Sequence, residues 1–294
     1  MVYIIVRKDV DMKKIFKFCK NILMISVLLV TTFFMFHECR QLFKEEKNEN
    51  VFKVGMECSY APFNWIQPNS KNDAVKISDG WYACGYDVYM AREIAKKMGK
   101  KLKVVKVDWD GLLPALTSGK IDAIIAGMSA TSERKQAIDF TDNYYTSNIV
   151  IVTKKNGKYS EASKLEDFSE AKITGQLSTI HYDLIDQIPK VKKETALEDF
   201  SSMVSALNAG KIDGYVSEKP SAMAVVSTNP SLKYIEFEND KGFKFSQEEI
   251  AISIGVKKGS SLKDEINEAL SMISEETRNK IMDKAVKNQL AINN

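Results

Sequence analysis

The chain is poor in the side chains that most often carry catalysis. Its 294 residues include only two histidines, His37 and His181, and four cysteines. The sequence shows no nucleophile paired with a base, no zinc-ligand spacing and no glycine-rich phosphate loop. The low cysteine content also excludes a small domain built on disulfides. We therefore expect no catalytic residues, no bound metal and no cofactor.

Most of the chain has no excess of positive or negative charge. The net charge of +3 arises within residues 1–50, which carry nine basic and six acidic residues, whereas residues 51–294 carry 33 of each. A nucleic-acid-binding surface shows a basic excess, so no nucleic-acid partner is expected. Apolar residues make up 44% and charged residues 28% of the chain, which excludes a disordered chain and a polytopic membrane protein.

Long hydrophobic runs are absent except for Ile22–Phe36, fifteen residues without a charge. Four lysines precede this run, and a basic start followed by a short apolar run is typical of a secretory signal. Cleavage of the leader, lipidation at Cys39 and an uncleaved anchor all remain open, although a full span needs about 20 residues. We predict that residues 1–50 are a signal peptide or membrane anchor plus linker. The remainder is expected to be exported, to the outer face of the cytoplasmic membrane, the periplasm or the medium.

Beyond residue 50 the sequence predicts an α/β fold. Short β-branched runs alternate with amphipathic segments, which favours parallel or mixed sheets covered by helices. Strands are expected at Val51–Met56, Lys103–Val107, Ile121–Ala126, near Lys172–Gly175 and at Ile212–Val216. Helices are expected at Asp87–Met98, Trp109–Ser118, Ser132–Ile138, Tyr182–Ile188, Asp199–Asn208, Leu262–Ile273 and Glu275–Lys287.

An internal repeat indicates two lobes built on one plan. Ala115–Asp122 reads ALTSGKID and Ala206–Asp213 reads ALNAGKID, so six of eight positions match. In each copy a predicted helix ends at glycine and a strand begins at isoleucine. Gly127 and Glu218 each follow the repeat's aspartate by five residues, at the carboxyl ends of the matching strands. Because ligands bind at that edge of open α/β sheets, we expect both residues to face one cleft.

The segment after the first copy carries a candidate anion site. Residues 127–134 read GMSATSER, follow a buried strand and begin a short helix. Free N–H groups at a helix start and the fork of an arginine both suit a carboxylate. Arg134 is one of five arginines, against 37 lysines. The alternative is that Thr131 caps the helix and Arg134 is a solvated surface residue, and the spacing leaves both interpretations open.

Aromatic residues gather at the ends of predicted elements. Tyr60, Phe63 and Trp65 follow the first strand, and Trp109 begins a helix. Such rings stack on apolar or cationic side chains of a ligand, or they belong to the core. We assign Phe63 to the core and retain Tyr60 and Trp109 as candidate ligand contacts.

Four segments together resemble a known family. They read YAPFNW at residues 60–65, GYDVYMAREIAKKMG at 85–99, DGLLPALTSGKIDAIIAGMSATSERKQAIDFTDNYY at 110–145 and GKIDGYVSEKP at 210–220. In this order they are similar to the amino-acid-binding proteins of bacterial ABC importers, solute-binding protein family 3, which includes binders of glutamine, histidine and lysine, arginine or ornithine. The resemblance extends over nearly all of residues 51–294.

The resemblance implies a fold and a division into domains. The fold is α/β and two-lobed, of the type II periplasmic-binding-protein kind, in which two hinge strands join lobes that close on a ligand like a flytrap. The chain is expected to cross between lobes near Asn148–Val152 and to return near Ile252–Val256. Lobe 1 would then consist of residues 51–148 and 257–294, and lobe 2 of residues 149–256 with the hinge strands at its ends.

The resemblance also implies a clamp for the α-carboxylate of an amino acid. Arg134 is expected to pair with it, helped by Ser129, and Thr179 in the segment Gln176–Thr179 is expected to donate from lobe 2. The family usually has glycine at the position of Ser178 and often a hydroxyl residue at that of Ile180. The complete expected ligand-binding set is Glu57, Tyr60, Trp109, Gly127, Ser129, Arg134, Gln176, Thr179 and Glu218.

The other end of the ligand is assigned in the same way. The α-ammonium is expected to meet the Gly127 carbonyl, the Ser129 hydroxyl and Glu218, where the family often has aspartate. Tyr60 and Trp109 would flank the ligand's side chain. Glu57 takes the position of the acid that faces the side chain in cationic-amino-acid binders, which favours lysine or arginine. The alternative is that Glu57 hydrogen-bonds its own loop and that the pocket takes glutamine or a small neutral amino acid.

The resemblance therefore predicts a monomeric, extracytoplasmic solute-binding subunit that hands a free amino acid to an ABC permease. A dehydratase-like enzyme of the same fold, with a tuned Glu57 or Glu218 as general acid, and a ligand-sensing domain are the alternatives. Cys58 and Cys84 are expected near the cleft mouth, either as free thiols or as a disulfide. The exported location favours the disulfide.

Overall fold

The computed structural model describes residues 51–292 of the chain. The predicted leader, with its apolar run and Cys39, lies outside the described residues. Within residues 51–292 no helix combines the length and the apolar character that crossing a membrane requires. Residues 50–294 form one compact unit, and the strands of its described part make up three sheets.

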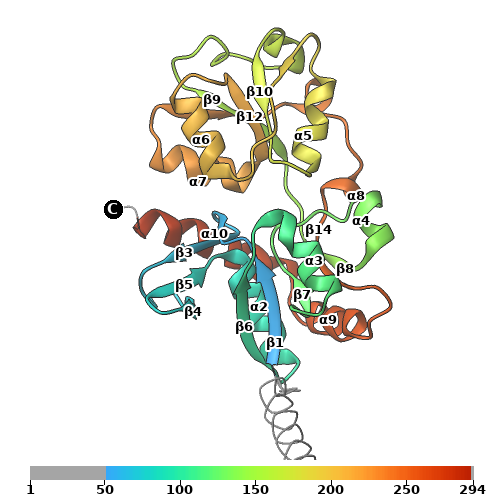
Figure 1. The fold of residues 1–294 in the computed structure, drawn as a ribbon. Helices are drawn as coiled ribbons and strands as arrows, with labels where there is room; N and C mark the ends of the chain where they lie inside the picture. Colours follow the sequence, from blue (N-terminus) through green and yellow to red (C-terminus); the bar gives the residue numbers. More distant parts are fainter. Residues whose placement is uncertain (1–50, 293–294) are drawn as a thin grey trace, which may run out of the picture. The chain divides into compact units, whose positions relative to one another are not determined.

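The first sheet has five strands in the order β6-β1-β7-β14-β8 (Figure 1). Strand β1 pairs in parallel with β6 and β7, whereas β14 runs antiparallel to both β7 and β8. The strands are β1 (Val51–Met56), β6 (Lys101–Lys106), β7 (Ala123–Ile124), β8 (Ile138–Tyr145) and β14 (Ile252–Lys257). The helices packed around this sheet are α2 (Tyr86–Lys97), α3 (Leu112–Thr117, after the 3-10 turn η1 at Trp109–Gly111), α4 (Ser132–Ala137), α9 (Leu262–Ser271) and α10 (Glu275–Ile292).

The second sheet also has five strands, in the order β11-β10-β12-β9-β13. Strand β12 pairs in parallel with β10 and antiparallel with β9. The strands are β9 (Ile149–Lys154), β10 (Lys172–Thr174), β11 (Lys192–Lys193), β12 (Gly214–Glu218) and β13 (Leu232–Ile235). The helices of this part are α5 (Ile180–Leu184, continued by η3 at Ile185–Gln187), α6 (Phe200–Asn208), α7 (Lys219–Thr228) and α8 (Gln247–Ile250), with 3-10 turns η2 (Leu165–Phe168) and η4 (Asn239–Lys241).

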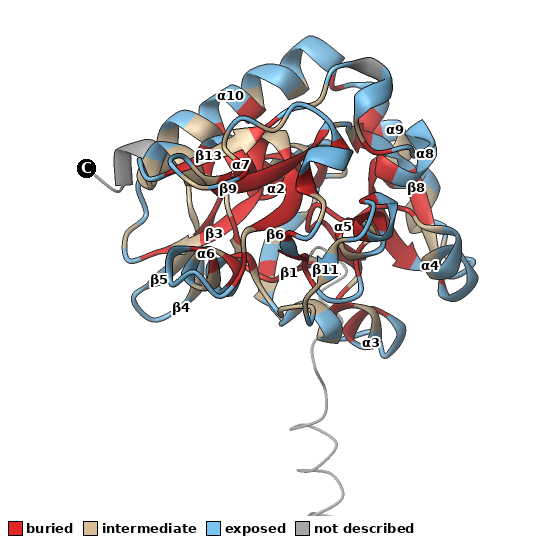
Figure 2. Cartoon of the chain, turned by 90° about the horizontal axis from the view of Figure 1, so that it is seen from above, coloured by how far each residue is buried: buried red, intermediate tan, exposed pale blue. Residues whose placement is uncertain are grey.

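A third, small antiparallel sheet has the order β2-β3-β5-β4. Its strands are β2 (Ser59–Tyr60), β3 (Asn64–Gln67), β4 (Val75–Ser78) and β5 (Trp81–Cys84). The sequence interpretation missed this sheet, together with β8, β13 and α7, because their strands are short or only partly buried and carry weak alternation. Buried residues are concentrated in the strands and on the inner sides of the helices, while α10 keeps one exposed side (Figure 2).

The repeat corresponds to the same structural unit in both large sheets. Helix α3 is followed by Gly119, with φ 78°, and β7; helix α6 is followed by Gly210, with φ 72°, and β12. In the first copy the Asp122 carboxylate accepts a hydrogen bond from the Lys53 backbone N–H at 2.7 Å. In the second copy the Asp213 carboxylate accepts one from the Lys172 N–H at 2.8 Å. Each aspartate therefore fastens its strand to the start of the neighbouring parallel strand.

The chain passes between the two large sheets twice. It leaves the first sheet at the end of β8 and enters the second at β9, and it returns between Ile235 and Ile252. The predicted boundary after residue 256 assigns most of β14 to lobe 2. In the structure, β14 pairs with β7 and β8 of the first sheet. The division into lobes at residues 148 and 256 stays a prediction.

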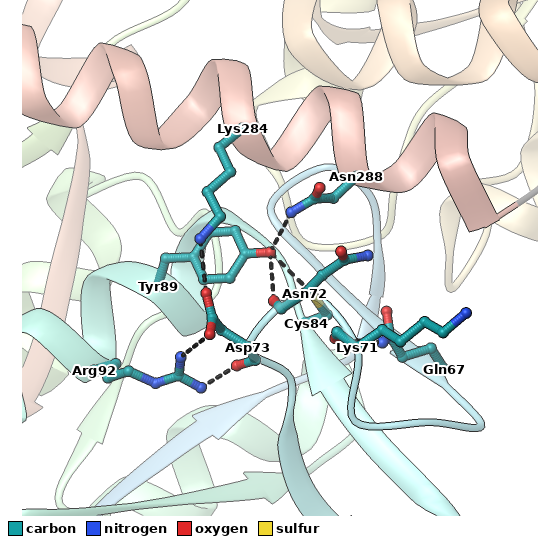
Figure 3. Close-up of polar contacts among 9 residues, drawn as sticks. All are labelled: Gln67, Lys71, Asn72, Asp73, Cys84, Tyr89, Arg92, Lys284 and Asn288. Atoms are coloured by element: carbon teal, nitrogen blue, oxygen red, sulfur yellow. Dashed lines mark hydrogen bonds and ion pairs between the residues drawn. The ribbon is translucent and has the colours of Figure 1, made fainter.

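The favoured disulfide between Cys58 and Cys84 is wrong, since both cysteines are free and buried. The Sγ of Cys84 lies 3.2 Å from the hydroxyl of Tyr89 and 3.5 Å from the carbonyl of Asn72, on the side that faces α10 (Figure 3). The thiol is therefore engaged with Tyr89 and Asn72. Burial raises the pKa of Cys58 to about 12 and raises that of Cys84, so both thiols stay protonated at neutral pH.

The same cluster fastens the end of the chain to the β3–β4 loop. Lys284 on α10 contacts the Asp73 carboxylate at 2.7 Å and lies 4.7 Å above the Tyr89 ring. Asn288, one turn further along α10, donates to the Tyr89 hydroxyl at 2.8 Å. Arg92 on α2 also contacts the Asp73 carboxylate, at 3.7 Å (Figure 3). Helix α10 is thereby held against α2 and the third sheet.

The junction between β5 and α2 needs a glycine for two separate reasons. Gly85 has φ 126°, and a methyl group there would collide with the carbonyl of Phe63. We expect Gly85→Ala to lower the free energy of unfolding by about 2–4 kcal/mol, measured by urea unfolding. Gly80→Ala is the matched control, because Gly80 has φ 77° in open space, and strain alone there costs about 1 kcal/mol. Equal losses in both variants would contradict the steric argument.

Candidate functional site

The predicted site residues lie at the carboxyl ends of strands in both large sheets. Glu57 follows β1, Gly127 follows β7 by a few residues, and Glu218 ends β12. This is the edge at which open α/β sheets bind ligands. A cavity of about 390 Å³ is lined by residues from both parts of the chain, although not by Glu57, Gly127 or Glu218 themselves. Of the predicted site residues, it is lined by Trp109, Arg134 and Thr179.

Arg134 joins the two sides of the cleft. The Thr131 hydroxyl accepts a hydrogen bond from the Arg134 backbone N–H at 3.3 Å, so the predicted cap of α4 is confirmed. The guanidinium is not freely solvated, as the alternative interpretation had it: its two NH₂ groups donate to the carbonyls of Ser129, at 2.8 Å, and Ser178, at 2.7 Å. The group also lies 5.2 Å from the centre of the Trp109 ring. Burial lowers the pKa of Arg134 to about 10, and the side chain remains charged at neutral pH.

The loop that supplies the Ser178 carbonyl has an unusual backbone. Ser178 has φ 56°, in the left-handed region that favours glycine, and the family usually has glycine there. Thr179 precedes α5 without capping it, and its hydroxyl donates instead to the Gln176 carbonyl at 2.7 Å. Gln176 and Thr179 are therefore buried in one tight turn beside Arg134.

Glu57 reaches across to the other lobe. Its Oε2 accepts a hydrogen bond from the Gln176 side-chain amide at 3.1 Å, and the amide also donates to the Glu198 carbonyl at 3.0 Å. The Oε1 of Glu57 is buried without a hydrogen-bond partner. Burial raises the pKa of Glu57 to about 7. The bond to Gln176 is a contact between lobes and differs from the alternative of a bond within the Glu57 loop.

Tyr60 is enclosed by rings on both of its faces. It stacks on Phe63 at 4.9 Å between centroids and on Phe200, from α6 of the second lobe, at 4.4 Å. Phe63 is fully buried, as expected of a core residue. Trp109, the other predicted aromatic contact, lies against the guanidinium of Arg134.

Gly127 has to be glycine because of this ring. An added Cβ would lie 2.8 Å from Cε1 of Tyr60, and the φ of Gly127 is 61°. The backbone N–H of Gly127 contacts the Tyr144 hydroxyl at 3.2 Å, and that hydroxyl donates to the buried Asp87 at 2.6 Å. The strand end that carries Gly127 is therefore fixed by a buried polar chain.

Glu218 and His181 form a buried pair in the second lobe. The Nε2 of His181 lies 3.1 Å from Oε1 of Glu218, and Oε2 of Glu218 is buried without a hydrogen-bond partner. Burial raises the pKa of Glu218 to about 8 and, together with the nearby charge of Arg134, lowers that of His181 to about 4. A cation that approaches the free oxygen of such a buried acid stabilises its ionised form strongly.

The structure adds three residues that the sequence interpretation did not place in the site. Ser178, His181 and Phe200 each contact a predicted site residue: Arg134, Glu218 and Tyr60, respectively. The positive φ of Ser178 leaves no trace in a single sequence. The other two contacts join segments that are distant in the sequence, which periodicity does not reveal. Ser129 contacts Arg134 through its backbone carbonyl, and its predicted contact with a ligand stays a prediction.

Residues 52–288 match the bacterial extracellular solute-binding proteins, family 3. The chain belongs to this family. Solute-binding proteins of type II have two α/β lobes around a ligand cleft, and the two five-stranded sheets and the cavity between them agree with that architecture.

Named relatives and solved structures of solute-binding proteins are similar along most of the chain. A probable histidine-binding protein of Campylobacter jejuni is 36% identical over 67% of this chain and 72% of its own length. A substrate-binding protein of an amino acid ABC transporter from Streptococcus pneumoniae, solved with L-arginine, is 28% identical with a TM-score of 0.70, over 82% of this chain and 95% of that one. An ancestral arginine-binding protein, solved with arginine, is 33% identical with a TM-score of 0.65, over 80% of this chain and 97% of that one.

The buried acids of the site predict a pH-dependent stability. The pKa of Glu218 rises from 4.5 to about 8 and that of Glu57 from 4.5 to about 7, so the folded protein holds both protons more tightly than the unfolded chain. Their stabilisation is complete below the unfolded pKa and is lost as pH rises through the folded pKa. We expect the Tm without added ligand to fall by a few degrees between pH 6.5 and about 8.5.

Glu218→Gln is the control for this pH dependence. The amide does not titrate, so the fall in Tm should be smaller in the variant than in the wild-type protein. His181, whose pKa is lowered to about 4, contributes with the opposite sign below pH 6.5, outside this window. A Tm that is independent of pH in the wild-type protein would show that the two carboxyl groups are not buried in solution.

Proposed function

We propose that this chain is the extracytoplasmic solute-binding subunit of an ABC transporter, which captures a free amino acid between its lobes and delivers it to the permease. One observation carries the proposal. Arg134 contacts the second lobe at Ser178 and is close enough to His181 for its charge to lower the pKa of that ring, and His181 lies 3.1 Å from Glu218, whose Oε2 is buried without a hydrogen-bond partner. The names of similar proteins, which bind histidine or arginine, support the substrate class.

The α-carboxylate would bind at Arg134. A zwitterion that leaves water requires a hydrogen-bonded partner of opposite charge at each end. Arg134 already donates to a carbonyl oxygen of the second lobe, Ser178, at 2.7 Å. A ligand carboxylate offers a charged acceptor in place of this neutral one, and charge-assisted hydrogen bonds are about twice as strong.

The α-ammonium would bind at Glu218, with the Gly127 carbonyl and Ser129 beside it. Because Arg134 and Glu218 belong to different lobes, a ligand that contacts both stabilises the closed arrangement over an open one. Gln176 and Thr179 are the other residues of the second lobe in the proposed binding site. Ligand binding thereby stabilises the closed form. A permease that recognises the closed form can distinguish loaded from empty subunits.

A cationic side chain fits this site best. The Oε1 of Glu57 is buried and unpartnered, so it can accept a hydrogen bond from an ammonium or guanidinium group. The cavity also carries three carboxylates against one arginine, and such a lining attracts cations. The three acids are Asp110, Glu133 and Asp183. We therefore propose lysine or arginine as the preferred ligand.

The remaining parts of the proposal concern the context of binding. We propose a monomer without a catalytic step, exported by its leader and held at the outer face of the cytoplasmic membrane or released. The family, whose members are extracellular solute-binding proteins, supports this location. No metal, cofactor or nucleic acid is part of the proposal.

Replacement of Arg134 tests the clamp. We expect Arg134→Ala to weaken amino-acid binding by about 2–5 kcal/mol, measured by calorimetry, because the carboxylate loses a charged two-pronged donor. Lys135→Ala, an exposed residue on the same helix, is the matched control and should bind normally. Wild-type affinity in Arg134→Ala, with both variants folded, would place the carboxylate site elsewhere.

Replacement of Glu57 tests the specificity. L-lysine or L-arginine should bind more tightly than L-glutamine and L-glutamate. Glu57→Gln should reduce their affinity about tenfold or more while changing that for L-glutamine by less than about threefold. Glu133→Gln makes the same change of charge at the exposed edge of the cavity and should have only a small, salt-screened effect. Tighter binding of glutamine than of either base, or an unchanged lysine affinity in Glu57→Gln, would refute the cationic assignment.

A further inference from the structure

The buried contact between His181 and Glu218 is not explained by the clamp. His181 lies on α5 with 5% of its surface exposed, and Glu218 ends β12 with 4% exposed. The Nε2 of His181 is 3.1 Å from Oε1 of Glu218. Two buried polar side chains at this distance constrain one another, because each would be costly to bury without a polar neighbour.

Glu218 lies at the start of helix α7, where the carboxylate of an acid normally caps the helix. It is the N-cap residue of α7, a position at which a carboxylate usually accepts hydrogen bonds from the first turn, yet its side chain makes no such bond. The carboxylate is turned toward His181 instead. The Nε2 of His181 lies 3.1 Å from Oε1, while Oε2 of Glu218 and both ring nitrogens of His181 are buried without a hydrogen-bond partner. The pair thus presents one oxygen of a flexible glutamate in a fixed orientation.

The surroundings of His181 keep its ring neutral and immobile. The ring packs edge-on against Phe200, with centroids 6.3 Å apart and planes at 81°. Phe200 in turn stacks on Tyr60. The charge of Arg134 on α4 disfavours a second cation at His181. The acids near the ring, besides Glu218, are Asp183 on the same helix and Glu57 beyond the end of β1. Burial and Arg134 together lower the pKa of His181 to about 4.

We propose that His181 is a positioning residue that holds Oε1 of Glu218, so that Oε2 is presented to the α-ammonium group of the ligand. His181 acts only through Glu218 and does not itself contact the ligand. It therefore favours ligands with a free α-amino group over analogues that lack one. This inference rests on the proposed function.

The test compares two replacements of His181, with L-arginine as the probe in calorimetry at neutral pH. His181→Leu fills the buried space but offers no polar atom to Glu218, and it should weaken binding about tenfold or more. His181→Gln retains an N–H donor and should stay within about threefold of the wild-type protein. In a Glu218→Gln background, His181→Leu should cause no further loss.

Two controls separate positioning from a general structural role. Leu184→Ala removes a buried side chain from the same helix without touching Glu218, so it should lower the Tm and leave affinity unchanged. The compound 5-guanidinopentanoic acid, which is arginine without its α-amino group, should bind the wild-type protein and His181→Leu equally.

The possible results lead to distinct conclusions. The inference is overturned if the leucine and glutamine variants bind L-arginine equally, whether both are normal or both impaired. It is also overturned if His181→Leu weakens the deamino compound as much as arginine. Absence of binding of any of the twenty amino acids to the wild-type protein would overturn the proposed function instead. The comparison of leucine with glutamine decides the question even where the Glu218→Gln protein binds too weakly to measure.

Discussion

The cleft depends on the compensation of buried charge. Glu57 and Glu218 are almost fully buried, and each keeps one carboxylate oxygen without a hydrogen-bond partner. Burying an ionised carboxylate costs free energy unless the group is protonated or lies next to a cation. For this reason burial raises the pKa of Glu57 to about 7 and that of Glu218 to about 8. The neighbours differ: the Gln176 amide donates a hydrogen bond to one oxygen of Glu57, whereas the His181 ring lies 3.1 Å from one oxygen of Glu218.

Three of the contacts between the lobes are individually small. The Arg134 guanidinium donates to the Ser178 carbonyl, the Gln176 amide donates to Glu57, and Tyr60 stacks on Phe200. Each is a single hydrogen bond or ring contact, worth about 0.5–3 kcal/mol. Contacts of this size can be exchanged for contacts to a ligand.

Much of the fold was predictable because its signals are local. The expected strand Val51–Met56 matches β1, and the repeat placed helix, glycine and strand correctly in both sheets. The prediction erred where tertiary packing decides. Cys58 and Cys84 were expected to bond, whereas the Cys84 thiol contacts Tyr89 in the cluster that holds α10. Similarly, one sequence shows that Arg134 begins a helix, but the carbonyl of Ser178, from a distant segment, decides that its guanidinium is not solvated.

The repeat also explains how one architecture supplies both ends of a zwitterion site. Asp122 and Asp213 fasten β7 and β12 in the same way, so the chain emerges from both strands at equivalent points. Five residues later the two copies differ. The first has Gly127, whose lack of a side chain admits the Tyr60 ring and leads into the helix of Arg134. The second has Glu218, whose carboxyl group lies 3.1 Å from the ring of His181. The same supporting unit therefore leads to a base, Arg134, in the first copy and to an acid, Glu218, in the second, which is the pair of charges that the proposed binding of a zwitterion requires.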